Sequence, residues 1–156
     1  MSNETHKLVI AIEYLNTAAT LWVHDLNHYS AMHLAAAAEE ISGKQCRYGG
    51  TPSHTDELKE WARQALKKMN IAYDEKEAFK FVYASKNAIK HMDSRKDSHV
   101  NLDARDEASR YINMAFRNFQ KLGLESFLLE AVNQVVHDRT IFVDVESDED
   151  PVEQRP

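Results

Sequence analysis

The sequence predicts an all-α fold, an up-and-down bundle of about five to six helices. Only 4 glycines and 3 prolines occur among the 156 residues, and such a scarcity of chain breakers disfavours a turn-rich β architecture. Apolar residues make up 43% of the chain and recur at three- and four-residue spacing, the period of a helix with one buried face. A chain of this length is expected to form one domain with a sizeable core.

Two helices are expected in the first third of the chain. The first spans residues 5–24, and its buried face is predicted to contain Leu8, Ile12, Leu15, Ala19 and Trp22. After a break, a second helix with Asn27 or Ser30 as its N-cap is expected to end at Ser42, before Gly43. This helix is rich in alanine, and small side chains let a neighbouring helix approach closely, so it is predicted to be the central one.

The next two helices follow a loop expected at residues 46–54, where paired glycines and a Thr-Pro occur. Ser53 or Thr55 is expected to cap the third helix, whose apolar residues are Leu58, Trp61, Ala65, Leu66 and Met69. A fourth helix is expected over residues 74–92. Its core face is predicted to contain Ala78, Phe81, Val82, Ser85, Ile89 and Met92.

Two further helices are expected after a polar, loop-like segment at residues 93–101. The fifth begins near Asp103 and stops at Gly123, and its apolar stripe contains Ala108, Tyr111, Ile112, Ala115, Phe119 and Leu122. Residues 124–138 are expected to form the sixth. Residues 140–145 alternate as in a strand and are expected to add a short extended piece or nothing.

Charge divides the chain into two parts. The net charge is −6, and residues 141–156 contain six acids and one base, which leaves −1 on residues 1–140. A nearly neutral body is unlike the basic surface of a dedicated duplex-DNA binder, although it permits a local basic patch. We therefore expect a helical domain at residues 1–140 and an acidic, disordered tail at residues 141–156.

The sequence disfavours three classes: membrane proteins, secreted proteins and proteins that bind a metal ion through cysteine thiolates. The longest apolar run, residues 31–38, is too short to span a bilayer, and the N-terminus lacks the pattern of a secretory signal. Cys46 is the single cysteine, so it forms no intrachain disulfide and no thiolate metal site. A cytoplasmic protein without a membrane partner, a cofactor or a metal ion is expected.

Polar residues gather near the end of the fourth expected helix. At about 100° per residue, Tyr83, Asn87 and His91 form one stripe, and Lys86 and Lys90 form the stripe beside it. An imidazole can act as a general acid or base near neutral pH, and ammonium groups can stabilise a phosphate or its transition state. These residues suit metal-independent cleavage of RNA by its own 2′-hydroxyl, although a solvated helix end with one histidine has the same composition.

The segment SKNAIKH, residues 85–91, resembles the signature of the HEPN superfamily, whose helical domains occur in many prokaryotic RNases, toxins and nucleotide-binding proteins. That signature is a basic residue, usually arginine, then a polar residue, often asparagine, and a histidine four to six positions after the base. Lys86, Asn87 and His91 occupy these places. The alanine-rich segment at residues 29–44 resembles a helix of small members, and the likeness covers most of residues 5–123.

The resemblance implies a homodimer with the signature helices near its two-fold axis, where nuclease members combine two half-sites that cleave RNA. It gives His91, Lys86 and Asn87 catalytic roles. Phosphate or nucleotide binding is expected of Lys90, Tyr83, Arg95 and Lys96. Lysine in place of the usual arginine keeps the charge but loses the planar fork that binds phosphate through two hydrogen bonds.

Two further groups of residues suggest different sites. On one continuous helix His24 and His28 could share a divalent ion, with His33 or a distant carboxylate completing the site. The expected break opposes this, and His33 among alanines is expected to be a core histidine. Glu40 is expected to pair with Lys44 on the next turn, whereas Glu39 would face the interior or line a pocket beside His91.

Three functions remain open from the sequence alone. They are a metal-independent RNA-cleaving domain, a non-catalytic domain that binds a nucleotide or a cognate protein partner, and a structural dimerisation module. The near-neutral body and Lys86 favour the second and third.

Overall fold

The chain folds into an all-α bundle in the computed structural model, which describes residues 4–139. The α-helices are α1 (Lys7–Val23), α2 (His28–Tyr48), α3 (His54–Lys68), α4 (Glu75–Ala88), α5 (Ala104–Lys121) and α6 (Glu130–Arg139). Two short 3₁₀ helices, η1 (Arg95–Asp97) and η2 (Glu125–Phe127), lie in the connections before α5 and α6. Residues 4–139 contain no strand, and this confirms the predicted helical bundle.

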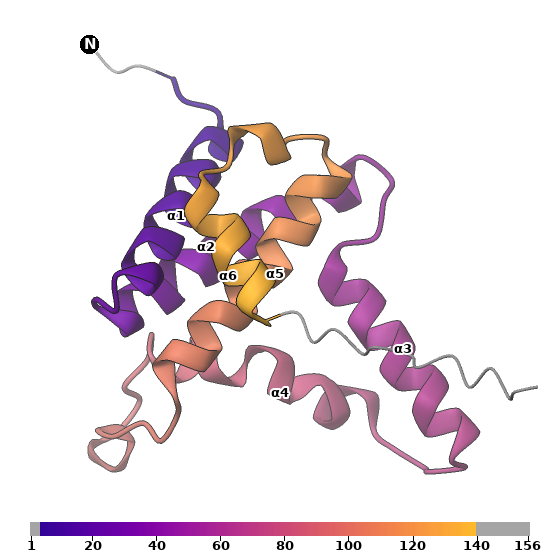
Figure 1. Ribbon diagram of the computed structural model, residues 1–156. Coiled ribbons are helices and arrows are strands. Elements are labelled where there is room, and N and C mark those ends of the chain that lie inside the picture. The colour runs from indigo at the N-terminus through magenta and orange to yellow at the C-terminus, as the bar shows by residue number, and fades with distance from the viewer. Residues whose placement is uncertain (1–3, 140–156) are drawn as a thin grey trace, which may run out of the picture.

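Helix α2 is central, as its alanines predicted. It packs against α1 and α5, and α6 lies against the same two helices (Figure 1). The alanines Ala31, Ala35, Ala36 and Ala38 are at most 1% exposed, which permits close approach of the neighbouring backbones. The largest fully buried side chains of the core are Leu15, Met32, Tyr111, Ile112, Phe119, Val132 and Val135.

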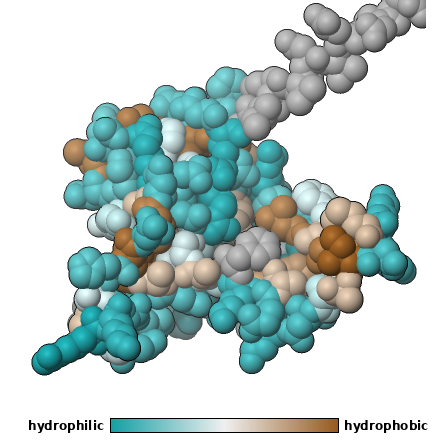
Figure 2. All heavy atoms as spheres, turned by 90° about the horizontal axis from the view of Figure 1, so that it is seen from below, coloured by the Kyte–Doolittle hydropathy of each residue, from teal (hydrophilic) through white to brown (hydrophobic). Residues whose placement is uncertain are grey.

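Helix α3 descends at the right of Figure 1 and α4 lies across the bottom, and the Arg63–Glu75 ion pair and Lys59 over the Tyr83 ring join the two. Together with their connection they form the α3–α4 arm, residues 54–88. Several large apolar side chains remain exposed at its end, among them Met69 at 59%, Ile71 at 48% and Tyr73 at 40%. Figure 2 shows this apolar surface at the right of the molecule.

Two helix starts that the sequence predicted are confirmed. The Ser53 hydroxyl accepts a hydrogen bond from the backbone nitrogen of Asp56 at 3.2 Å, and the Asp56 carboxylate accepts one from the backbone nitrogen of Ser53 at 3.0 Å. This reciprocal pair is a capping box at the start of α3. Asp103 caps α5, because its carboxylate accepts hydrogen bonds from the backbone nitrogens of Arg105 and Asp106, both at 3.0 Å.

Two predicted helix ends are wrong. Helix α2 passes through Gly43, which is buried within the helix, and ends at Tyr48. A Cβ there would lie 3.3 Å from both the Asn118 amide nitrogen and the Ser53 Cβ, so glycine serves close packing. Helix α4 ends at Ala88, and Met92, predicted to lie in the core, is 70% exposed.

The connections agree with some predictions and differ from others. The break between the first two helices is confirmed, and Asn27 precedes α2 in a left-handed conformation with a φ of 44°. Residues 124–138 form η2 and most of α6 instead of one helix. The strand-like residues 140–145 and the acidic tail at 141–156 lie outside the described residues. None of the described helices combines the length and the apolar character that crossing a bilayer requires.

Candidate functional site

The position of α4 is fixed by contacts with α5. The Tyr111 hydroxyl donates to the backbone oxygen of Val82 at 3.3 Å, and the Ser85 hydroxyl donates to the Glu107 carboxylate at 2.5 Å. Arg110 donates to the same carboxylate at 2.7 Å, so Glu107 is shared by two partners. These contacts hold the last two turns of α4 against α5.

Lys86 is buried at the contact between α4 and α2. It is 8% exposed, its Nζ donates to the Glu40 carboxylate at 3.0 Å, and it lies 4.7 Å from the centroid of the Tyr83 ring. Lys44 donates to the other oxygen of Glu40 at 2.9 Å. Hydrogen bonds from Lys44 and Lys86 lower the pKa of Glu40 from 4.5 to about 2. The charge of Lys86 is therefore balanced inside the protein.

These groups line a small polar pocket of about 320 Å³, here named the α2–α4 pocket. Its walls are Glu39, Glu40, Gly43, Lys44, Arg47, Tyr83, Lys86 and Asn87. Three cations and two carboxylates meet there, and most already have partners: Arg47 forms an ion pair with Asp56 at 2.8 Å. Asn87 is exposed at the rim.

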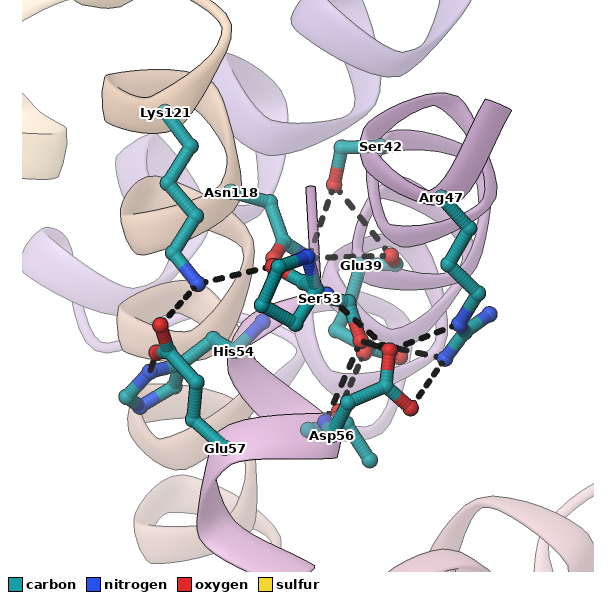
Figure 3. A network of polar contacts seen from close by, with 11 residues as sticks. Glu39, Ser42, Arg47, Ser53, His54, Asp56, Glu57, Asn118 and Lys121 are labelled. Atoms are coloured by element: carbon teal, nitrogen blue, oxygen red, sulfur yellow. Dashed lines mark hydrogen bonds and ion pairs between the residues drawn. The ribbon is translucent and has the colours of Figure 1, made fainter. Parts of the chain in front are cut away.

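Glu39 belongs to a buried polar network that holds the start of α3 (Figure 3). It is 3% exposed, and its carboxylate accepts a hydrogen bond from the Thr55 hydroxyl at 2.6 Å. Burial raises the pKa of Glu39, because the charged form is poorly solvated. Asn118 of α5 accepts from the His54 backbone nitrogen at 2.8 Å and donates to the Ser42 hydroxyl at 3.3 Å. The network thus joins α2, α3 and α5.

His91 lies on the other side of α4's end. Because the helix stops at Ala88, the backbone nitrogen of His91 bonds to the Asn87 oxygen in a turn at 3.2 Å, and the side chain is exposed. His91 lines a groove of about 660 Å³, here named the His33–His91 groove. The other walls include Tyr29, Ser30, His33 and Leu34 of α2, Ile89, Met92, and the segment Asp97, Ser98 and Val100.

The structure therefore divides the predicted site in two. Tyr83, Lys86 and Asn87 line the α2–α4 pocket, and His91 lines the His33–His91 groove. The expected stripe of Tyr83, Asn87 and His91 on one helix face is wrong for its last member, since α4 ends three residues before His91.

The predicted phosphate-binding cations lie on the connection that supplies part of the groove's wall, but they are not among its lining residues. Lys90, Arg95 and Lys96 are exposed on the connection after α4, and the last two begin η1. Tyr83, also predicted to bind a nucleotide, is half-buried under two ammonium groups: Lys86, and Lys59 at 5.0 Å from the ring centroid.

Sequence reasoning offers His33 only as a metal ligand or a core histidine and misses its place in the groove that His91 lines. The prediction that it is a core histidine is wrong, because it is exposed and shares a groove with His91. A signal was present: Tyr29 and His33 are four residues apart, so they share a helix face that the buried alanines do not occupy.

Further contacts involve the histidine group and the two glutamates of α2. The His28 imidazole bonds to the Asp25 carboxylate at 2.9 Å, and within residues 4–139 no three His, Cys, Asp or Glu side chains are placed to hold a metal ion. The predicted pairing of Glu40 with Lys44 is confirmed. Glu39 faces the α2–α4 pocket and not the groove that contains His91.

Comparison of this chain with protein-family models, with curated proteins and with solved structures finds no match.

Proposed function

We propose that this chain is a HEPN-like helical domain that binds RNA or a nucleotide in the His33–His91 groove and cleaves RNA there without a metal ion. The observation that carries the proposal is the pair of exposed imidazoles, from α2 and from the turn after α4, that line one groove. Imidazole can accept or donate a proton near neutral pH, so two of them can serve as the base and the acid of one reaction.

The reaction is an attack of the RNA's own 2′-oxygen on the adjacent phosphorus. One imidazole accepts the proton of the 2′-hydroxyl while the new O–P bond forms, and the other gives a proton to the 5′-oxygen as its bond to phosphorus breaks. The products are a 2′,3′-cyclic phosphate and a free 5′-hydroxyl. No external nucleophile or oxidant is needed.

The surroundings of the groove suit a nucleotide. Tyr29 is 51% exposed and Met92 70% exposed, which leaves a ring and a thioether accessible to the face of a base. Lys90, Arg95 and Lys96 are exposed on the connection that borders the groove, where they can attract phosphate. In this proposal Lys86 positions α4 through Glu40 and does not bind the substrate directly.

A mutational assay tests the proposal. Mixed RNA is incubated with the purified chain in chelator, and the products are examined for 2′,3′-cyclic phosphate ends. We expect His33→Ala and His91→Ala to lower the rate at least about 100-fold, the usual contribution of a general acid or base. His24→Ala is the matched control, because this exposed histidine follows α1 and does not line the groove. Unchanged cleavage in both groove variants would contradict the proposal.

A non-catalytic role in binding a protein or a second copy is the second candidate, and the exposed apolar side chains of the same groove favour it. Tyr29, Met92 and Val100 expose 51%, 70% and 38% of their surfaces. If the chain cleaves no RNA and nucleotides leave its melting temperature unchanged, sedimentation at several concentrations decides between these roles. If the chain is a dimer and Met92→Glu dissociates it, the result supports this groove as an interface between two copies. Such a homodimer is also part of the HEPN-like proposal.

A further inference from the structure

A second groove lies between the two helices of the arm and is separate from the His33–His91 groove. This α3–α4 groove has a volume of about 510 Å³. Lys59 and Arg63 line it from α3, and residues between Glu75 and Asn87 line it from α4. Phe79 and Tyr83 give it an apolar floor, and Arg63 lies 5.1 Å from the Phe79 ring centroid.

The lining of the α3–α4 groove is cationic. Four bases and two acids line it, which gives a net charge of +2. Within residues 4–139, Lys59 and Lys76 have no carboxylate within 4.0 Å, and Lys80 meets only Glu77 at 3.8 Å, where both side chains are about 70% exposed. An ion pair so exposed contributes little, so at least three ammonium groups can attract another anion.

We infer that the acidic segment of this chain, residues 141–153, binds in the α3–α4 groove. The segment has the complementary chemistry: Ile141, Phe142, Val143 and Val145 precede or interleave with its first acids, and six carboxylates follow over ten residues. Apolar side chains of the segment pack on Phe79 and Tyr83, and its carboxylates pair with the groove's lysines. The interaction does not depend on the function proposed for the other groove.

The end of the described chain lies on the helix that also holds α4. Arg139 donates to the Asp106 carboxylate at 2.8 Å and to the Ser109 hydroxyl at 2.7 Å, on the first turns of α5. Glu107, between them in sequence, accepts the hydrogen bond from Ser85 of α4. Arg139, the last described residue, and Ser85 of α4 therefore bind adjacent residues of α5.

The length of the segment suffices to reach the groove. From Ser85 back to Lys76 is nine helical residues, about 14 Å along α4. Residues 140–153, fourteen in all, span up to about 46 Å when extended, which exceeds this distance of about 14 Å together with the side chains that link Arg139 to Ser85 through α5. The carboxylates of the segment would then offset the groove's excess positive charge of +2 and cover its apolar floor.

Paramagnetic relaxation in the full chain tests this inference. A nitroxide is attached to Ser147→Cys, and the unsubstituted chain, treated in parallel, verifies that buried Cys46 takes no label. We expect line broadening concentrated on the amides of residues 59–63 and 76–83. The broadening should be independent of protein concentration and should disappear at high salt, where exposed charges are screened.

Matched charge reversals give the specificity of the contact. Lys76→Glu with Lys80→Glu reverses the groove's net charge and should abolish the broadening, whereas Lys67→Glu with Lys68→Glu makes the same change on exposed α3 lysines outside the groove and should preserve it. Four results would each overturn the inference. They are broadening centred on residues 90–97, equal loss of broadening in both double variants, loss of broadening on dilution, and no broadening at all.

Discussion

Replacing Glu40 by glutamine removes the carboxylate that Lys44 and Lys86 share, and its effect can be estimated from the structure. A carboxyl pKa that falls from 4.5 to about 2 on folding corresponds to about 3 kcal/mol at neutral pH, since each pKa unit is 1.36 kcal/mol. The Glu40 side chain is 41% exposed, so screening by water reduces the figure to about 1–2 kcal/mol. We expect Glu40→Gln to lower the free energy of unfolding at pH 7 by this amount.

The pH dependence of this loss follows from the sign of the shift. Because the folded-state pKa of Glu40 is lowered, its contribution is fully present above pH 4.5 and is lost as the pH falls toward about 2. Urea unfolding followed by circular dichroism should therefore show two curves, wild type and variant, that converge on acidification. Asp56 titrates in the same range: burial raises its pKa, but hydrogen bonds from Arg47 and Ser53 outweigh burial and lower the pKa to about 2. Because Asp56 titrates in both proteins, its effect cancels in the difference between the two stability curves.

A control variant separates the ion pair from the loss of any surface carboxylate. Glu13 is exposed on α1 and has no ion pair among residues 4–139, so Glu13→Gln should change the stability by less than about 0.5 kcal/mol. Equal stability of wild type and Glu40→Gln at pH 7 would refute the reasoning. So would a difference that persists unchanged at pH 2, because protonated Glu40 cannot pair with Lys86.

Three further predictions concern buried positions. Gly43→Ala should lower the melting temperature in spite of alanine's better helix propensity, because the new methyl group would lie 3.3 Å from an Asn118 amide held by several hydrogen bonds. Tyr111→Phe should cost about 1–2 kcal/mol in urea unfolding, since the Val82 backbone oxygen loses a hydrogen bond; an unchanged midpoint would contradict this. Burial raises the pKa of the Cys46 thiol, so a thiol reagent at pH 8 should react far more slowly with the folded chain than with the chain in urea.

Most of the helices could be predicted from the sequence because their signals are local. Ser53 and Asp103 cap helices through their own side chains, and the alanines of α2 predict its central place without knowledge of its neighbours. The prediction at Gly43 is wrong for the opposite reason. Its role is set by Asn118, 75 positions away in the chain, and no local pattern distinguishes a glycine that ends a helix from one that lets another element approach.

The site was predictable only in part, since its geometry depends on where α4 ends. Lys86, Asn87 and His91 are close in sequence, yet the turn after Ala88 sends His91 to a different groove from Lys86. The groups that these residues meet come from α2: Glu40 forms an ion pair with Lys86, and His33 lines the same groove as His91. Contacts between distant helices of this kind leave no trace in the spacing of one motif.

The buried network at the start of α3 also determines how the arm can move. Apolar surfaces slide over one another at small cost, but hydrogen bonds require particular directions, and Thr55, Asn118 and Glu39 each meet a partner in one orientation. The arm should therefore occupy either a single seated position or a released one, with few positions between them. The α2–α4 pocket and the His33–His91 groove, which are both lined by residues of α2 and α4, would then open or close together.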